Sequence, residues 1–273
     1  MGISTGISTG VEALTPPKSQ IESAAAEPAP ILAEPNAASP APTLQAYFKV
    51  MSAQMGPMKW WRAKNSFEVI VGAILVQNTA WKNVKLALIN LHSEKLLTPR
   101  AIAKVSTARL QRLIRSSGYF RQKAKKLKVF VKFLDETYRG SLKRMFAAPT
   151  DKLREQLLAV HGIGPETADS ILLYAGGHAV FVVDAYTKRL LARHGLMRED
   201  AKYDEVQAFF ERHLPRDAKL FNEYHALIVN VGKNWCRKRE ALCAECPLEK
   251  FLPEVAAEAR GLVTIGNALE SAR

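Results

Sequence analysis

The residues LLAVHGIGPETA, at positions 157–168, decide the fold of this chain. An amphipathic helix is expected to end at Val160, and Pro165 suits the first position of a second helix. The two glycines between them allow positive φ angles and a close approach of the backbone to another molecule. The unpaired amides and positive dipole end of the second helix then face the turn, which suits a phosphate group. The stretch therefore predicts a phosphate-binding helical hairpin, with a plain helix–helix turn as the alternative.

The charge of the chain favours the phosphate-binding interpretation. Its 273 residues include 39 lysines and arginines against 26 acidic residues, a net charge of +13. One stretch has eight basic residues and no acidic one, namely Arg112, Arg115, Arg121, Lys123, Lys125, Lys126, Lys128 and Lys132. A solvated helix face normally mixes both signs, so we expect this stretch and the hairpin to bind the DNA backbone. Solubility alone is the other interpretation of the charge.

The two ends of the chain differ from its middle. Residues 1–43 contain seven of the 14 prolines, are rich in alanine, serine and threonine, and have one lysine against four glutamates. Such a composition buries too little apolar surface to offset chain entropy, so we expect a disordered tail. It shows no basic start followed by an apolar stretch, and no secretory signal is expected. Residues 256–273 are interpreted as a second tail.

Helical periodicity dominates between the tails. The segment from Phe67 to Leu75 carries apolar residues on nearly all sides, as a central core helix does, and Asn65 can cap it. Amphipathic segments with short linkers follow, and only Ala179–Val183 resembles a strand. The fold is therefore predicted to be all-α. The longest apolar run, Val69–Val76, is shorter than the ~18 residues of a membrane span, so no membrane partner is expected.

Two further motifs carry side chains with chemistry. Cys236, Cys243 and Cys246 lie within eleven residues, and an odd, clustered set favours a metal or cluster site over disulfides. Such cysteines indicate a reducing compartment, so a cytoplasmic protein is expected. In FVVDAYTKRL, at residues 181–190, Asp184 follows two β-branched residues at the expected start of a helix. Taken alone, this position is typical of a helix cap, and a site role stays open.

Together the motifs resemble one family, the helix-hairpin-helix DNA glycosylases related to endonuclease III. The resembling segments are VHGIGPETAD, FVVDAYTKRL, SFEVIVGAILVQNTAW, IRSSGYFRQKAKKL and WCRKREALCAECPLEK. They occur in the order typical of the family and cover roughly residues 44–253. Glu166 in the hairpin, the pair Trp60 and Trp61, and Gln-Asn-Thr at 77–79 are most similar to the 3-methyladenine DNA glycosylase branch.

The resemblance implies an architecture and a partner. It implies a six-helix barrel with the hairpin at residues 65–178, and a second helical domain from residues 44–64 plus 179–255 that carries the cysteine loop. It implies a monomer that binds double-stranded DNA containing a damaged base and flips that base out of the duplex. Gln77 matches the residue that fills the vacated space. The expected DNA-binding residues are Gly162, Ile163, Gly164, Thr167, Gln77, Lys123, Lys188 and Lys233.

Position 166 decides which reaction the resemblance implies. Family members that also cut the strand have a lysine there, which forms a Schiff base with the sugar. Because Glu166 cannot form an imine, Asp184 remains to stabilise the positive charge on the sugar and to orient or deprotonate a water. The expected activity is hydrolysis of an N-glycosidic bond without strand cleavage. The alternatives are an endonuclease III-like glycosylase and lyase for oxidised pyrimidines, and a DNA-binding module without catalysis.

The branch resemblance implies an alkylated purine as the base. Its positive charge suits stacked aromatics, which makes Trp60 and Trp61 candidates for the base pocket. Glu166 is placed there as well, with pairing to a neighbouring cation or a second acid/base role as the alternatives. The tryptophans are equally interpreted as core or interface residues. Adjacent residues of a helix face different sides, so at most one of the two is expected to stack on the base.

The cysteine loop departs from the family pattern. Members with a 4Fe-4S cluster have the spacing Cys-x6-Cys-x2-Cys-x5-Cys, whereas here Leu252 stands at the fourth position. The resemblance therefore leaves two interpretations of Cys236, Cys243 and Cys246. They hold a 4Fe-4S cluster that another ligand completes, or they belong to a degenerate loop of reduced thiols.

Overall fold

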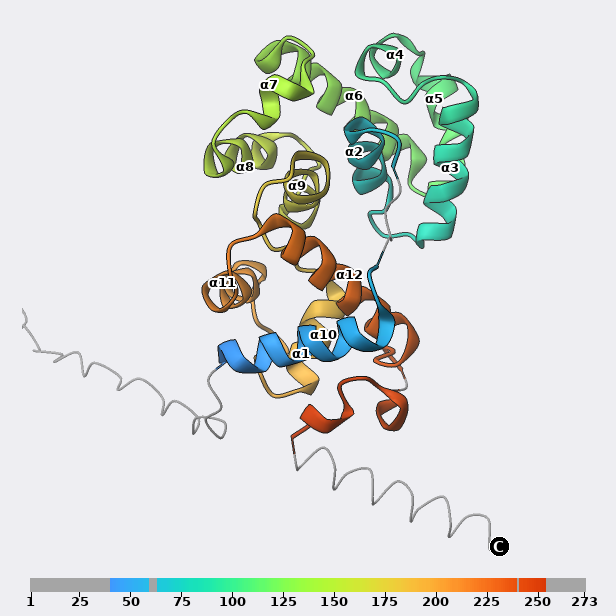
Figure 1. Ribbon diagram of the computed structural model, residues 1–273. Coiled ribbons are helices and arrows are strands. Elements are labelled where there is room, and N and C mark those ends of the chain that lie inside the picture. Colours follow the sequence, from blue (N-terminus) through green and yellow to red (C-terminus); the bar gives the residue numbers. More distant parts are fainter. Residues whose placement is uncertain (1–39, 59–62, 240, 254–273) are drawn as a thin grey trace, which may run out of the picture. The chain divides into compact units, whose positions relative to one another are not determined.

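The computed structural model describes residues 40–58, 63–239 and 241–253, which belong to one compact unit, Ala37–Arg273, built from helices (Figure 1). In these ranges there is no strand, only an antiparallel bridge between Cys236 and Ala241. The prediction of an all-α fold is confirmed. No helix in the same ranges is long and apolar enough to cross a membrane.

The helices follow one another with short connections. The α-helices of the described part are α1 (Pro40–Met55), α2 (Ser66–Leu75), α3 (Trp81–Ser93), α4 (Pro99–Lys104), α5 (Thr107–Leu113), α6 (Phe120–Tyr138), α7 (Leu142–Phe146), α8 (Thr150–Ala159), α9 (Pro165–Ser170), α10 (Ala185–Arg193), α11 (Tyr203–His213) and α12 (Ala218–Asn234). Single 3₁₀ turns form η1 (Arg115–Ser117), η3 (Cys243–Glu245) and η4 (Glu249–Phe251). A π-helical turn, η2 (Ile171–Ala175), directly continues α9.

The first core cluster is built around α2. Asn65 begins this helix as predicted, because its side chain accepts a hydrogen bond from the amide of Glu68 (2.9 Å). The residues from Val69 to Leu75 are all buried, since α3, α6, α9 and η2 pack around the helix. The cluster extends along the chain from Phe67 to Val180 and fixes the hairpin between α8 and α9.

The second core cluster lies among α1, α10, α11 and α12 (Figure 1). Phe181 stacks on Phe210 with ring centroids 3.8 Å apart. The hydroxyl of Tyr224 in α12 donates to the carbonyl of Leu44 in α1 (2.8 Å), which joins segments far apart in the sequence. At Gly232 a side chain would overlap the ring of Tyr186, so the glycine allows α12 to approach α10 closely. The first turn of α10 is thereby held against α12.

The predicted domain boundaries lie close to the limits of these clusters. The second cluster joins α1 to residues from 181 onward, and Leu173 of η2 also packs in it. The division into residues 65–178 and residues 44–64 plus 179–255 stays a prediction, because the described residues form one compact unit.

The expected tails lie mainly outside the described residues. Helix α1 begins at Pro40, so the last residues of the segment 1–43 are helical rather than disordered. Proline suits this position because the first helical residue needs no amide hydrogen. Residues 1–39 and 256–273, as well as Trp60 and Trp61, lie outside the part that the structure describes.

Candidate active site

The hairpin has the geometry that the sequence predicts. α8 ends just before Val160, and α9 begins at Pro165. In the turn the amide of Ile163 donates to the carbonyl of Val160 (3.0 Å), and Gly162 has a φ angle of +88°. A side chain at Gly162 would come within 2.8 Å of the Lys126 chain. Glycine is therefore required here both by its backbone angle and by the space available.

Gln77, which follows α2, holds the hairpin. Its Nε2 donates to the carbonyl of Gly162 (3.2 Å) and to Oγ1 of Thr167 (2.9 Å), and its Oε1 accepts from Nζ of Lys126 (2.5 Å). The predicted insertion of Gln77 into DNA is not tested by this arrangement. In the free protein the side chain of Thr167 is engaged by Gln77 and is 6% exposed. The expected contact of Thr167 with a phosphate stays a prediction.

An open hollow of about 630 Å³ lies beside the hairpin. Polar groups from several elements line it, among them Gln77, Lys126, Gly164, Glu166, Ser170 and Tyr203. Asp184 is not among the lining residues, but its charge raises the pKa of Glu166, which places the two carboxylates within electrostatic reach.

Asp184 caps α10. Its Oδ1 accepts from the amide (2.8 Å) and the hydroxyl (3.0 Å) of Thr187, and its Oδ2 lies 3.6 Å from Nε2 of His225. Burial alone would raise the pKa of Asp184, but the charge of the nearby His225 and the hydrogen bonds from Thr187 outweigh it and lower the pKa. The carboxylate is therefore ionised at neutral pH. With 13% of its side chain exposed, it is not sealed from solvent.

Three titratable groups surround Asp184 besides His225. Partial desolvation of its carboxyl, and then the charge of Asp184, raise the pKa of Glu166, which solvent still reaches from the hollow. Burial raises the pKa of Tyr174 well above its usual value, and the charges of both carboxylates add to the effect. Burial lowers the pKa of Lys233, and the charge of Asp184 opposes this. The arrangement can therefore concentrate negative charge beside a positively charged reactant.

Comparisons with known proteins agree with this geometry. The profile of the HhH-GPD superfamily of base excision DNA repair proteins matches residues 71–216. A candidate DNA repair glycosylase of Methanocaldococcus jannaschii is 49% identical, over 75% of this chain and 93% of its own length. This chain belongs to the HhH-GPD superfamily. Members of the superfamily excise bases, and the chain is a DNA N-glycosylase of base excision repair.

Two solved structures of DNA glycosylases are similar to the structure of the HhH-GPD glycosylase. The H. pylori 3-methyladenine DNA glycosylase MagIII bound to 1,N6-ethenoadenine is 31% identical, with a TM-score of 0.62, over 71% of this chain and 97% of that chain. A non-covalent endonuclease III–DNA complex has a TM-score of 0.69 at 24% identity, over 81% of this chain and 98% of that chain. The second likeness shows the fold alone.

The glycosylase contains a buried network between the hairpin and Asp184 that the sequence did not reveal. Asp169 of α9 is fully buried and accepts two bonds from Arg154 (2.8 and 3.1 Å). Its Oδ2 also accepts from Tyr203 (2.8 Å) and Gln207 (2.8 Å). The hydroxyl of Tyr203 in turn accepts from the amide of Val183 (3.4 Å), which directly precedes Asp184. The network therefore ties the position of this acid to the hairpin.

Lys123 does not lie where the sequence analysis expects it. It was expected to bind DNA, but it is 2% exposed, and its Nζ donates to the carbonyls of Leu75 (2.9 Å) and Ser117 (2.6 Å). The reason is that Lys123 lies on the core face of α6, next to the buried Ala124 and Leu127. Burial, and the charge of Lys126, lower its pKa to about 8.

The buried amine makes stability depend on pH. The pKa of Lys123 is about 8 in the folded protein and 10.5 ordinarily, so the unfolded chain binds this proton more tightly. The free energy of unfolding of the wild type, relative to Lys123→Met, will therefore rise as the pH increases from 8 to 10.5. Urea unfolding at about pH 7 and about pH 10 measures this difference. The exposed neighbour Lys125→Met serves as control, and an equal pH response of both variants would contradict the prediction.

Some of the other lysines and arginines predicted to bind DNA donate to backbone carbonyls, whereas others are exposed to solvent. The amine of Lys188 donates one hydrogen bond to the carbonyl of Ala201 (2.7 Å), and its contact with DNA stays a prediction. Lys128 likewise donates to the carbonyls of Ala103 and Val105. The exposed members of the predicted set are Arg112, Arg115, Arg121, Lys125, Lys132 and Lys233.

Tyr119 was not among the predicted site residues. It precedes α6 with a φ angle of +44° and is 64% exposed, in the midst of the basic stretch. Gly118 before it has a φ angle of +66°, so two consecutive residues have positive φ angles. The sequence signal was present as an aromatic residue after glycine in a basic segment, but the exposure of the ring became visible only in the structure.

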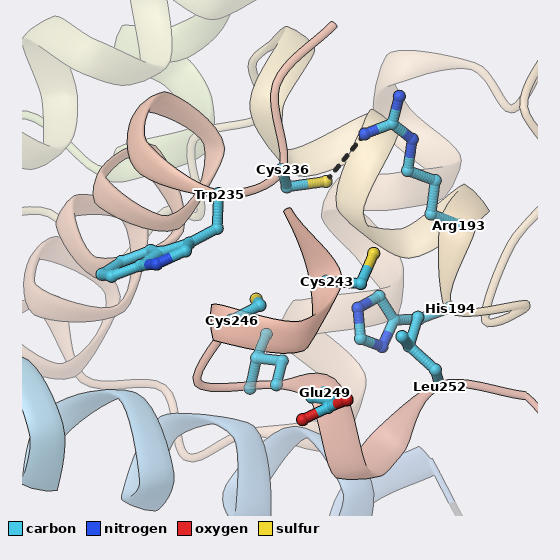
Figure 2. A pocket seen from close by; sticks show the side chains of 9 residues that line it. Arg193, His194, Trp235, Cys236, Cys243, Cys246, Glu249 and Leu252 are labelled. Atoms are coloured by element: carbon cyan, nitrogen blue, oxygen red, sulfur yellow. Dashed lines mark hydrogen bonds between the residues drawn. The ribbon is translucent and has the colours of Figure 1, made fainter. Parts of the chain in front are cut away.

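The three cysteines are free thiols that line one small cavity of about 20 Å³ (Figure 2). Its lining also includes Arg193, His194, Trp235, Leu248, Glu249 and Leu252. Burial raises the pKa of Cys246, a backbone hydrogen bond at Leu248 opposes this, and the charges of the other two thiols and of Glu249 add to the increase. Nη1 of Arg193 donates to Sγ of Cys236 (3.3 Å). The thiols thus share one electrostatic environment.

The fit of a 4Fe-4S cluster to this cavity is partial. Three thiols can bind three iron atoms, but Leu252 has no donor atom for the fourth. Nδ1 of His194 is bonded to the hydroxyl of Tyr47 (2.8 Å). Within the described ranges no three His, Cys, Asp or Glu side chains are placed to hold a single metal ion. A cluster bound to these three thiols would lack a side-chain ligand from Leu252 on its fourth iron.

Proposed function

We propose that the glycosylase hydrolyses the N-glycosidic bond of an alkylated purine without cutting the DNA strand, with Asp184 as the catalytic carboxylate. The observation that carries the proposal is that the side chain of Asp184 is ionised and partly exposed. In addition, Glu166 stands at the position where a strand-cutting relative has lysine. As the bond to the base breaks, positive charge develops on the sugar, and a fixed carboxylate stabilises it. A water bound by Asp184 then attacks the sugar carbon.

The proposed substrate class follows from the second carboxylate. Glu166 and Asp184 lie within electrostatic reach, so an uncharged base gains little there and a cationic one gains more. A purine nucleotide alkylated at a ring nitrogen, such as 3-methyladenine, carries such a charge, and the similar protein MagIII is named a 3-methyladenine DNA glycosylase. Trp60 and Trp61 remain the proposed aromatic residues of the base pocket.

The proposed partner is double-stranded DNA containing a damaged base. The hairpin backbone at Gly162, Ile163 and Gly164 would approach one phosphate, and the exposed cations before and along α6 would bind others. The exposed ring of Tyr119 adds a group that can stack between bases. We propose further that the protein acts as a cytoplasmic monomer.

The experiment that tests the proposal is incubation of the protein with duplexes that contain alkylated, oxidised or uracil bases. We expect free alkylated purine in solution and an intact strand at the abasic site. Borohydride added during turnover is expected to trap no protein–DNA adduct, because trapping needs an imine. Release of only oxidised pyrimidines, together with a trapped adduct, would contradict the proposal.

A second candidate is a glycosylase with lyase activity that uses Lys233. Its amine is exposed, its pKa is lowered, and it lies within electrostatic reach of Asp184. A protein of Thermotoga maritima named endonuclease III is 30% identical over 67% of this chain and 80% of its own length. An adduct formed by the wild type and lost in Lys233→Arg would support this candidate over the first.

A further inference from the structure

Three side chains behind the proposed catalytic carboxylate form a chain of close contacts. His225 of α12 is 4% exposed, and its Nδ1 lies 2.6 Å from the hydroxyl of Tyr174. Its Nε2 lies 3.6 Å from Oδ2 of Asp184. Tyr174 belongs to the π-helical turn η2, and such turns occur frequently at functional sites. Groups from η2, the start of α10 and α12 thus meet at one point.

We propose that Tyr174 and His225 form a relay that orients and ionises Asp184, with His225 as a positioning residue. The proposal rests on the proposed function of Asp184, because only then does the orientation of this carboxylate affect a reaction. Neither residue was a site candidate on sequence grounds, since a histidine within an amphipathic helix carries no distinguishing pattern.

The hydrogen bond between Tyr174 and His225 determines which atom of His225 faces Asp184 with a hydrogen. Burial and the charges of Asp184 and Glu166 raise the pKa of the phenol well above its usual value, so it keeps its proton at any working pH. The phenol oxygen then binds Nδ1 of His225 as an acceptor when the imidazole is charged and as a donor when it is neutral, and in both states the hydrogen on Nε2 faces Asp184. A hydrogen bond at one ring nitrogen fixes the state of the other in this way.

The two carboxylate oxygens of Asp184 are bound from different sides. Thr187 binds Oδ1 through its amide and hydroxyl, whereas His225 faces Oδ2. Rotation of the carboxylate would break contacts on both sides, so its plane is fixed before a substrate binds. A group held in its reactive geometry contributes more to a transition state than one that must first be ordered.

Two other charged groups lie near Asp184 and also affect its pKa. Glu166 of α9 adds negative charge near Asp184, and Lys233 of α12 adds positive charge. Removal of His225 leaves these two groups in place. Burial of Asp184 is then less well opposed, so the pKa of this carboxyl rises.

The test combines a titration of the free protein with kinetics. In His225→Gln, the pKa of Asp184, followed by carbon NMR of the carboxyl, is expected to rise by about one unit or more. The acid limb of the single-turnover rate of base release will move to higher pH by the same amount. At neutral pH the rate will fall roughly tenfold through lost orientation, while affinity for DNA stays unchanged.

A conservative variant and two controls separate positioning from folding. Tyr174→Phe keeps the ring, and we expect nitrogen NMR to show His225 in mixed tautomers and the pKa of Asp184 to rise by less than in His225→Gln. The matched controls are His213→Gln in α11 and Tyr138→Phe in α6, whose side chains bind Phe209 and Gln156 instead. Both are expected to leave the titration of Asp184 unchanged.

The outcomes distinguish this inference from the proposed function. An unchanged pKa of Asp184 in folded His225→Gln or Tyr174→Phe would overturn the relay, whatever the activity. If the pKa moves as expected but the wild type releases no base from any lesion, the relay stands and the proposed function fails.

Discussion

Replacement of Asp184 by asparagine will lower the rate of base release from a lesion-containing duplex by roughly a thousandfold. Asparagine has the same shape and can still accept the hydrogen bond from the amide of Thr187 that caps α10, so the fold will be retained. It lacks the negative charge that stabilises the sugar cation and the basicity that activates a water. Single-turnover assays on the duplex identified by the lesion panel measure the effect.

A matched control separates charge at the site from charge at a helix end. Asp217 caps α12 in the same manner, accepting from the amides of Lys219 (2.6 Å) and Leu220 (3.3 Å) on an exposed surface. Asp217→Asn is expected to release base within about twofold of the wild-type rate, because surface substitutions away from a site have small effects. Both variants should bind the lesion duplex as the wild type does. Full turnover by Asp184→Asn would refute its assignment.

The features that the sequence predicts correctly are local ones. A positive φ angle at Gly162 and a helix beginning at Pro165 depend on residues within one turn, and both are present. Asp184 caps α10 for the same reason, since its partner is three residues away. The capping role that the residues suggested is real, and it is compatible with a catalytic one because Thr187 occupies a single carboxylate oxygen.

The features that the sequence could not predict depend on tertiary packing. Lys123 and Lys125 are both lysines of the same basic stretch, yet one is buried and the other exposed, because only the first lies on the face of α6 that packs inward. Tyr174 and His225 are 51 residues apart, and their contact exists only once η2 and α12 are packed together. A count of charges along the chain cannot supply either distinction.

The buried ion pair of the hairpin leads to the largest expected effect on stability. Asp169→Ala removes a fully buried carboxylate and leaves Arg154, Tyr203 and Gln207 without this acceptor. Breaking a buried pair by removing one partner costs about 3–5 kcal/mol, because the remaining groups stay desolvated. We expect the free energy of unfolding, measured with urea on the full chain, to fall by about 3 kcal/mol, since Arg154 keeps a second partner in Asp204.

The control for Asp169→Ala is Glu94→Ala, which removes the carboxylate that pairs with Arg109 on the surface, where both side chains are more than a third exposed. An exposed pair contributes about 0–1 kcal/mol, so this variant should unfold almost as the wild type does. Equal losses in the two variants would show that the buried network is not what holds the hairpin.

Asp169→Ala is also expected to slow base release under conditions where the protein remains folded. The reason is that Tyr203 binds both Asp169 and the amide of Val183, so the chain before Asp184 loses its anchor.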